Sequence, residues 1–347
     1  MNTRFTTAAL AFAAALQLGS SSPADADKVE ITSVQNIVIG ASGLDPFRRP
    51  LALAADPLRG VLLVADTGNR RVVVFDRTGR ARGVIGSAPV DERGTVGAPS
   101  ALALDRRGRI YVLDEIRRTI DVLTPTGSRI AELAPVLPST AASGTMLQDL
   151  AIGSSGSIYL LYTGATPGIL VLDAKGRTTR EIGFLAASAD GLNGPVAIAV
   201  SASETMIATV DPRAENSVRV ISADGALVAC FGSHGEGEGT FSLAANVAFG
   251  PGETVWVVDA VRHSLSAFEP DGRFIGRIGG FGAGPGQFNY PIACEFLADD
   301  LIAVLERAGD RLQMLRLDVE TSGEPRLASE APALTASELG EITGGRR

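Results

Sequence analysis

Two carboxylates and one amide stand out at matching places in six short apolar segments. Aligned with one another, the segments read Ala52, Ala101, Asp149, Ala197, Asn246 and Ala293, and two residues further on they read Ala54, Ala103, Ala151, Ala199, Ala248 and Glu295. If the segments meet around one axis, Asp149, Asn246 and Glu295 share a central channel. Their oxygens suit Ca²⁺ or Mg²⁺. A water-filled channel and an acid–base role are the other two interpretations.

The six segments belong to a repeat that runs through the chain. Apolar runs end at Asp66, Asp114, Tyr162, Asp211, Asp259 and Glu306, so that successive end points are 48, 48, 49, 48 and 47 residues apart. Each repeat contains four short runs of apolar and β-branched residues, separated by turns rich in Gly, Asp and Pro, which is typical of strands. Four antiparallel strands in each of six units predict an all-β, six-bladed β-propeller.

Two of the repeats carry the pattern of a known family. Residues 61–86, "VLLVADTGNRRVVVFDRTGRARGVIG", and 255–291, "VWVVDAVRHSLSAFEPDGRFIGRIGGFGAGPGQFNYP", resemble NHL repeats. The shared features are an Asp that closes the second strand, an Arg at the start of the third, an Asp-Gly or similar turn, and a Gly-rich linker with a Phe. The resemblance covers about residues 33–318, although the second repeat has Thr119 in place of the Arg. It implies a propeller whose broad face binds a partner.

The stretch "GGFGAGPGQFNYP", residues 279–291, looks at first like a phosphate-binding loop. A phosphate loop opens a helix, whose N-terminus supplies N–H groups. Here a strand pattern follows instead. We therefore expect a linker between the outer strand of one blade and the inner strand of the next.

The sixth repeat lacks an obvious fourth strand. Residues 33–50, "SVQNIVIGASGLDPFRRP", repeat the linker's order of strand, glycines, Phe and Pro. We therefore expect residues 33–40 to form the outer strand of the last blade and to close the ring. The segment "SGEPRLAS" after Asp318 is a competing candidate.

The loops between second and third strands emerge together on one face, since neighbouring strands run in opposite directions. They carry six arginines without an assigned structural role, which are Arg70, Arg117, Arg118, Arg213, Arg262 and Arg307. By contrast, Arg71 and Arg311 are expected to pair with acids such as Asp66 and Glu306. The six arginines predict a basic face for an acidic protein or an anionic envelope polymer. Ordinary solvated charge is the alternative interpretation.

Composition excludes some functions. The net charge of −8 and the low aromatic content of 5% make nucleic acid an unfavourable partner. Only His234 and His263 are present, so a three-histidine zinc site cannot form. Cys230 and Cys294 fall on strands of different blades and are expected to remain thiols.

The N-terminus has the order of a secretory signal peptide. "MNTR" precedes an apolar run of about 15 residues, which is short for a membrane span, and Ala24-Asp25-Ala26 fits a cleavage site. We expect residues 1–26 to be removed on export to the periplasm or the medium. Residues 27–320 are then a monomeric propeller with no transmembrane segment, and residues 321–347 a flexible polar tail.

These observations lead to two alternative functions. The main prediction is an exported, rigid binding platform without catalytic residues or cofactor. The alternative is a Ca²⁺- or Mg²⁺-dependent hydrolase or lyase with its site at Asp149, Asn246 and Glu295. This trio is similar, in residue type only, to the axial ion site of gluconolactonase-like propellers.

Overall fold

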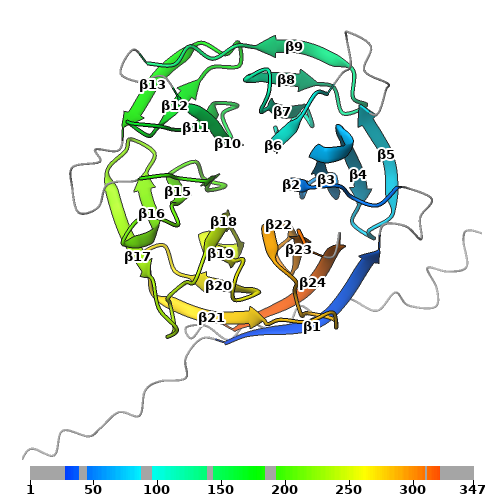
Figure 1. Ribbon diagram of the computed structural model, residues 1–347, viewed down its shortest axis with the longest axis vertical. Helices are drawn as coiled ribbons and strands as arrows, with labels where there is room; N and C mark the ends of the chain where they lie inside the picture. Colours follow the sequence, from blue (N-terminus) through cyan, green and yellow to red (C-terminus); the bar gives the residue numbers. More distant parts are fainter. Residues whose placement is uncertain are drawn as a thin grey trace, which may run out of the picture. The chain divides into compact units, whose positions relative to one another are not determined.

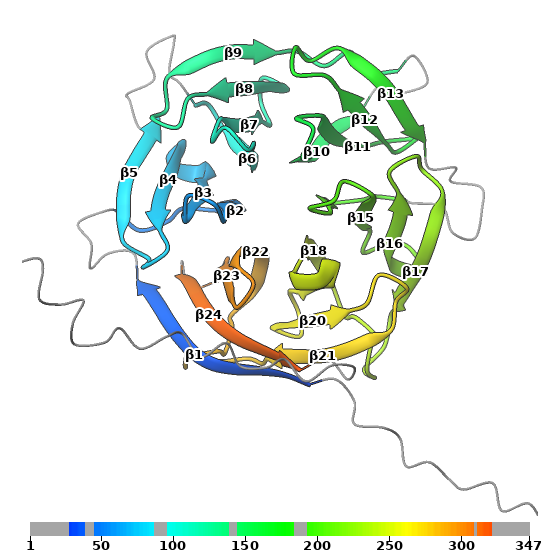
Figure 2. The same ribbon diagram turned by 180° about the vertical axis from the view of Figure 1, so that it is seen from behind.

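The chain forms a closed ring of six small β-sheets. A computed structural model describes residues 28–38, 45–86, 96–138, 144–183, 193–308 and 311–320. Each sheet has four antiparallel strands, with one strand at the centre of the ring and one at its rim (Figures 1 and 2). The predicted all-β, six-bladed propeller is confirmed.

Blades 1 to 3 each use four consecutive strands, ordered from the axis outwards. Blade 1 consists of β2 (Pro50–Asp56), β3 (Val61–Asp66), β4 (Arg71–Asp76) and β5 (Ala81–Gly86). Blade 2 consists of β6 (Pro99–Leu104), β7 (Ile110–Asp114), β8 (Thr119–Leu123) and β9 (Arg129–Leu133). Blade 3 consists of β10 (Met146–Ile152), β11 (Ile158–Thr163), β12 (Gly168–Leu172) and β13 (Thr178–Gly183).

Blades 4 and 5 follow the same plan, and blade 6 combines the two ends of the described chain. Blade 4 consists of β14 (Ala197–Val200), β15 (Met206–Val210), β16 (Asn216–Ser222) and β17 (Leu227–Ser233). Blade 5 consists of β18 (Ala244–Phe249), β19 (Val255–Asp259), β20 (Ser264–Phe268) and β21 (Phe274–Gly279). Blade 6 consists of β22 (Pro291–Ala298), β23 (Leu301–Glu306), β24 (Arg311–Glu320) and β1 (Lys28–Val38). Two short 3₁₀ turns, η1 (Thr67–Asn69) and η2 (Pro251–Glu253), lie in connections.

The N-terminal strand closes the ring, as the repeated linker pattern predicts. β1 pairs antiparallel with β24 from Lys28 opposite Glu320 to Val38 opposite Arg311. It lies outside β24 in both views (Figures 1 and 2). The strand begins five residues earlier than expected and ends at Val38. Pairing with β1 covers the edge that β24 would otherwise leave free, and it joins the two ends of the described chain in one sheet. The competing segment "SGEPRLAS", residues 322–329, lies outside the described residues.

The core consists of apolar layers between neighbouring blades. Leu53 and Phe75 of blade 1 pack in one cluster with Leu305 and Met314 of blade 6. Because a blade is covered on both faces, its middle strands are buried along their length, as in β7, where all five residues are buried. This explains why the second strands read as continuous apolar runs rather than as alternating patterns.

The acid that ends most second strands fastens the preceding linker to its blade. The N–H of Arg48 donates to Asp66 Oδ1 at 2.7 Å, and the N–H of Gly194 donates to Asp211 Oδ2 at 2.7 Å. In blade 6 the N–H of Asn289 donates to Glu306 Oε2 at 2.6 Å. All three carboxylates are fully buried. The repeated acid therefore has a structural role, because it satisfies backbone groups that the turn would otherwise leave without a partner.

The expected strand-opening arginines form the predicted ion pairs. Arg71 Nε lies 2.7 Å from Asp66 Oδ2, and Arg311 Nε lies 2.7 Å from Glu306 Oε1. Both arginines also donate to linker carbonyls, Arg71 to Asp45 and Arg311 to Gln287. These pairs hold the loops in place.

The Gly-rich stretch at 279–291 joins two strands, as expected, and no helix follows it. Phe288 is fully buried, and a Cβ on Gly279 would lie 2.5 Å from its ring. Gly279 has φ +98°, a conformation that favours glycine. The glycine therefore makes room for the phenylalanine, which packs beneath the outer strand. The phosphate-loop interpretation is excluded by this arrangement.

The predictions for the chain ends fall on residues 1–26 and 321–347, which lie outside the described residues. Within the described part of the chain, no helix is long and apolar enough to cross a membrane. Cys230 on β17 and Cys294 on β22 form no disulfide, as their positions on different blades predict.

Candidate functional site

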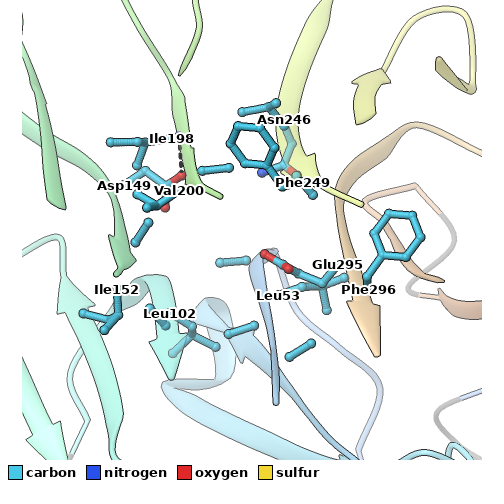
Figure 3. Close-up of a pocket in the computed structure, with 18 of the residues that line it drawn as sticks. Leu53, Leu102, Asp149, Ile152, Ile198, Val200, Asn246, Phe249, Glu295 and Phe296 are labelled. Atoms are coloured by element: carbon cyan, nitrogen blue, oxygen red, sulfur yellow. Dashed lines mark hydrogen bonds between the residues drawn. The ribbon is translucent and has the colours of Figure 1, made fainter. Parts of the chain in front are cut away.

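A cavity of about 520 Å³ follows the axis of the ring. Residues of all six inner strands line it, and Asp149, Asn246 and Glu295 are the polar side chains at its middle (Figure 3). The structure therefore brings the three predicted axial residues together. Ala52 and all six positions of the second predicted set also line the cavity, whereas Ala101, Ala197 and Ala293 are packed between blades.

Asp149 is held by two backbone N–H groups. It follows an irregularity in the pairing of β10 with β11, between Leu147 and Asp149. Its Oδ2 accepts a hydrogen bond of 2.9 Å from the N–H of Ile198 in the next blade, and its Oδ1 accepts one of 2.8 Å from the N–H of Leu150. Burial raises the pKa of Asp149 to about 7, although both hydrogen bonds oppose this shift. The carboxyl therefore titrates near neutral pH.

Asn246 occupies the same place in blade 5 and makes the same kind of contact. It too follows an irregularity, between Ala244 and Asn246. Its Oδ1 accepts a hydrogen bond of 3.1 Å from the N–H of Cys294 in blade 6. This leaves the Nδ2 amide group available to donate into the cavity.

Glu295 lies on β22, in the blade across the axis from Asp149 (Figure 3). Its carboxyl receives no hydrogen bond from the described residues. Burial, and next the charge of Asp149, raise the pKa of Glu295 to about 8. The cavity thus contains two carboxyl groups whose simultaneous ionisation is costly.

A hard divalent cation fits this set of donors. The two carboxylates supply oxygen at the centre of the cavity, and Asn246 Oδ1 keeps one lone pair beside its bond to Cys294. A positive ion there would offset the cost of ionising both acids. No cluster of three or more His, Cys, Asp or Glu side chains that could hold a metal occurs among the described residues. A cation would therefore take its remaining ligands from water or from a substrate. Without a cation, the pair retains a proton near neutral pH and can serve in acid–base chemistry.

Other cavity residues escaped the sequence analysis. Gln148 and Ser100 line the cavity near the start of their strands. A set of half-buried apolar residues lies three positions beyond the first aligned set, and consists of Leu104, Ile152, Val200 and Phe249. We call these four residues the apolar collar. Their spacing of 48, 48 and 49 residues follows the repeat, so the same alignment contains the signal.

Three of the six predicted face arginines make contacts within the protein, namely Arg117, Arg118 and Arg262. Arg117 pairs with Asp114 at 2.9 Å and with Glu132 at 3.2 Å, and it also contacts Asp121. Arg118 donates to the carbonyl of Thr145 at 2.7 Å. These contacts stabilise the loops of blade 2 and its neighbour, although both residues remain exposed.

Arg262 is the third arginine with an internal contact, and the other three are exposed. Arg262 is half-buried and donates to the carbonyl of Thr240 at 2.9 Å. Arg70, Arg213 and Arg307 are exposed, and their side chains have no ion-paired partner among the described residues. None of the six arginines lines the axial cavity. The basic face is therefore a set of separate loop residues rather than one site.

Comparisons with known proteins identify relatives by fold only. No family model matches the chain, and no curated protein matches it in sequence. The resemblance to NHL repeats thus stays an expectation. Among solved structures, a gluconolactonase from Xanthomonas campestris has a TM-score of 0.56 at 16% identity, covering 85% of this chain and 95% of its own.

Two further solved structures match this chain over a similar share of its length. Regucalcin from Agrobacterium tumefaciens, described as a calcium-binding protein, has a TM-score of 0.56 at 17% identity and covers 81% of this chain and 94% of its own. A streptogramin B lyase has a TM-score of 0.55 at 11% identity and covers 83% of this chain and 98% of its own. At these identities the likeness establishes a shared six-bladed fold.

The prediction of a non-enzymatic binding platform is wrong. The similar structures carry the names of a lactonase, a lyase and a calcium-binding protein.

Proposed function

We propose that this protein is a hydrolase or lyase that acts in the axial cavity and depends on a divalent cation, Ca²⁺ or Mg²⁺. The observation that carries this proposal is the pair Asp149 and Glu295, two carboxyl groups from opposite blades that share one cavity, with Glu295 lacking a hydrogen-bond donor among the described residues. Asn246 adds a third oxygen or an amide donor.

The similar structures support this proposal through their names alone. They include an enzyme that acts on a lactone, a lyase and a calcium-binding protein. The finer assignment to NHL repeats also belongs to this proposal, since it rests on the Asp, Arg and Gly-Phe pattern of the sequence.

The roles of the three residues follow from their contacts. A bound cation would polarise a carbonyl oxygen of the substrate and lower the pKa of a water molecule. Asp149 is fixed by two N–H groups, so it is suited to hold one position without moving. Asn246 can orient a substrate oxygen through Nδ2. Glu295 has the freest carboxyl and is suited to accept a proton from water or from the substrate.

The first experiment is a thermal melt of the full chain in chelator and then with Ca²⁺ or Mg²⁺. A cation at 100 times its Kd adds about 2.7 kcal/mol to the free energy of unfolding. We expect one cation to raise the midpoint, and Glu295→Gln to remove that rise. Asp299→Asn is the matched control, because Asp299 is an exposed carboxylate that also lines the cavity.

Turnover is measured on lactones and esters with the cation that stabilises the protein. Loss of turnover in Glu295→Gln, with a cooperative melt in chelator that shows the variant to be folded, supports the proposal. A stabilising cation without turnover on any of these compounds would contradict an enzymatic role. Turnover that persists in chelator and requires Glu295 would instead indicate metal-free acid–base catalysis.

A further inference from the structure

We infer that the axial cavity selects a neutral substrate with an apolar tail, such as an alkyl-substituted lactone or ester, and disfavours polyhydroxylated and anionic compounds. The inference rests on the proposed function for the reaction class. It concerns the substrate specificity of the same site. It depends on the residues that form the walls of the cavity, and not only on Asp149 and Glu295.

The charge of the cavity disfavours anions. None of the residues that line it is Lys, Arg or His. Its ionisable side chains are all acids, with Asp149 and Glu295 at the centre and Glu253 and Asp299 at the end where the inner strands stop. A phosphate or carboxylate on the substrate would meet this negative charge without a protein cation to offset it.

The scarcity of donors disfavours sugars. The lining side chains that can donate a hydrogen bond are Ser100, Gln148 and the Asn246 amide, apart from any carboxyl that holds a proton. A sugar lactone carries several hydroxyl groups, and each one that is buried without a partner costs binding free energy. A site for such a ring needs many more polar groups than this cavity offers.

The apolar collar offers a place for a hydrocarbon chain. Ile152 and Phe249 lie three residues beyond Asp149 and Asn246 on their strands, and Leu104 and Val200 hold the same position in two other blades. All four side chains are half-buried, because each packs on one side against an apolar cluster between blades while it also lines the cavity. Figure 3 shows Ile152, Val200 and Phe249 around the same space as the acids. A polar group bound at Asp149 and Glu295 would direct its tail toward this collar.

The test measures binding without requiring turnover. Calorimetry on the full chain with saturating cation compares δ-valerolactam, which resists hydrolysis, with derivatives that carry ethyl, butyl and hexyl tails. Each methylene buried in the collar adds about 0.8 kcal/mol, which is about fourfold in affinity. We expect affinity to rise by at least tenfold from the unsubstituted lactam to the butyl derivative. Affinity that is independent of tail length, or tighter binding of a gluconolactam, would overturn the inference.

A variant tests whether the apolar collar causes the rise in affinity with tail length. Val200→Thr keeps the side-chain shape and replaces one methyl group with a hydroxyl. It should therefore weaken binding of the hexyl derivative by about three- to tenfold and leave the affinity for the unsubstituted lactam unchanged. The control is Val228→Thr on the outer strand of the same blade, where Val228 is 48% exposed. Equal loss of affinity for all ligands, or loss of affinity in the control alone, would contradict the proposal that the apolar collar binds the tail. If Val200→Thr does not fold, the wild-type series decides.

The two proposals fail in different ways. Affinity that rises with tail length, without turnover of any lactone or ester, would refute the proposed reaction and keep the ligand class. Turnover of lactones with no dependence on tail length would keep the reaction and refute the ligand class.

Discussion

The carboxylate of Asp149 in blade 3 accepts a hydrogen bond of 2.9 Å from the backbone N–H of Ile198 in blade 4. Asn246 makes the equivalent bond to Cys294 between blades 5 and 6, at 3.1 Å. The same position therefore fastens neighbouring inner strands with either a charged or a neutral side chain. Mutation can therefore separate the contribution of this hydrogen bond to stability from the effect of the charge on Asp149.

Asp149→Asn should keep the fold and lose the cation. Asn246 demonstrates that an amide oxygen accepts this bond. At about pH 4, where the folded Asp149 carboxyl is protonated, we therefore expect the free energy of unfolding to change by less than about 1 kcal/mol. Cation affinity near pH 8 should fall by at least about tenfold. Asp149→Ala removes the acceptor as well, and should cost about 1–3 kcal/mol. Urea denaturation and calcium titration measure the two effects. Similar stability in both variants would contradict a structural role for the bond.

Cation binding should depend steeply on pH. With pKa values of about 7 for Asp149 and about 8 for Glu295, both groups must lose a proton before they bind a cation. Affinity should therefore rise with pH up to about 8, and fall below pH 6 by up to about 100-fold per unit. Calorimetry in buffers of different ionisation enthalpy counts the released protons. No proton release in the wild type would refute the coupling.

The cation-free protein should lose stability as pH rises. The folded-state pKa values of Asp149 and Glu295 lie above the ordinary values of 3.8 and 4.5. Between about pH 4 and 8 the folded state thus binds more protons than the unfolded state, and the free energy of unfolding decreases with increasing pH. Urea denaturation in chelator across this range tests the sign. The Asp149→Asn, Glu295→Gln double variant should show a flatter profile, and an identical profile would contradict the assignment.

The buried pair of Arg71 and Asp66 should matter far more than a surface pair. Their side chains are 6% and 0% exposed, so Arg71→Ala leaves a buried carboxylate without its cation and should cost about 3–5 kcal/mol. Arg177, whose side chain is 74% exposed beside Asp173, is the control. Arg177→Ala should cost less than about 1 kcal/mol. Denaturation curves compare the two, and equal losses would show that the buried pair does not fix the linker.

Much of the fold was predictable because its determinants are local and repeated. The acids from Asp66 to Glu306 mark the ends of second strands, where each carboxylate binds the linker of its own blade. The N-terminal copy of the linker, with its buried Phe47, predicted that an early strand completes the last blade. Neither inference required knowledge of which blades face one another.

The use of the arginines could not be read from the sequence. Arg117 resembles a free loop residue, yet the fold places it beside Asp114, Asp121 and Glu132 from three strands of blade 2. Asp121 is fully buried on the middle of β8, a position where most blades have an uncharged residue. Such pairing depends on side chains that meet only after the strands assemble.

The sequence by itself determined the six-bladed ring and the three axial residues, because the period of the strands and the order of the linkers are written along the chain. Tertiary structure alone decided the chemistry of those residues. Asp149 and Glu295 influence each other's ionisation only because ring closure sets blades 3 and 6 across one axis, and because apolar side chains from the inner strands exclude much of the water that would otherwise screen their charges.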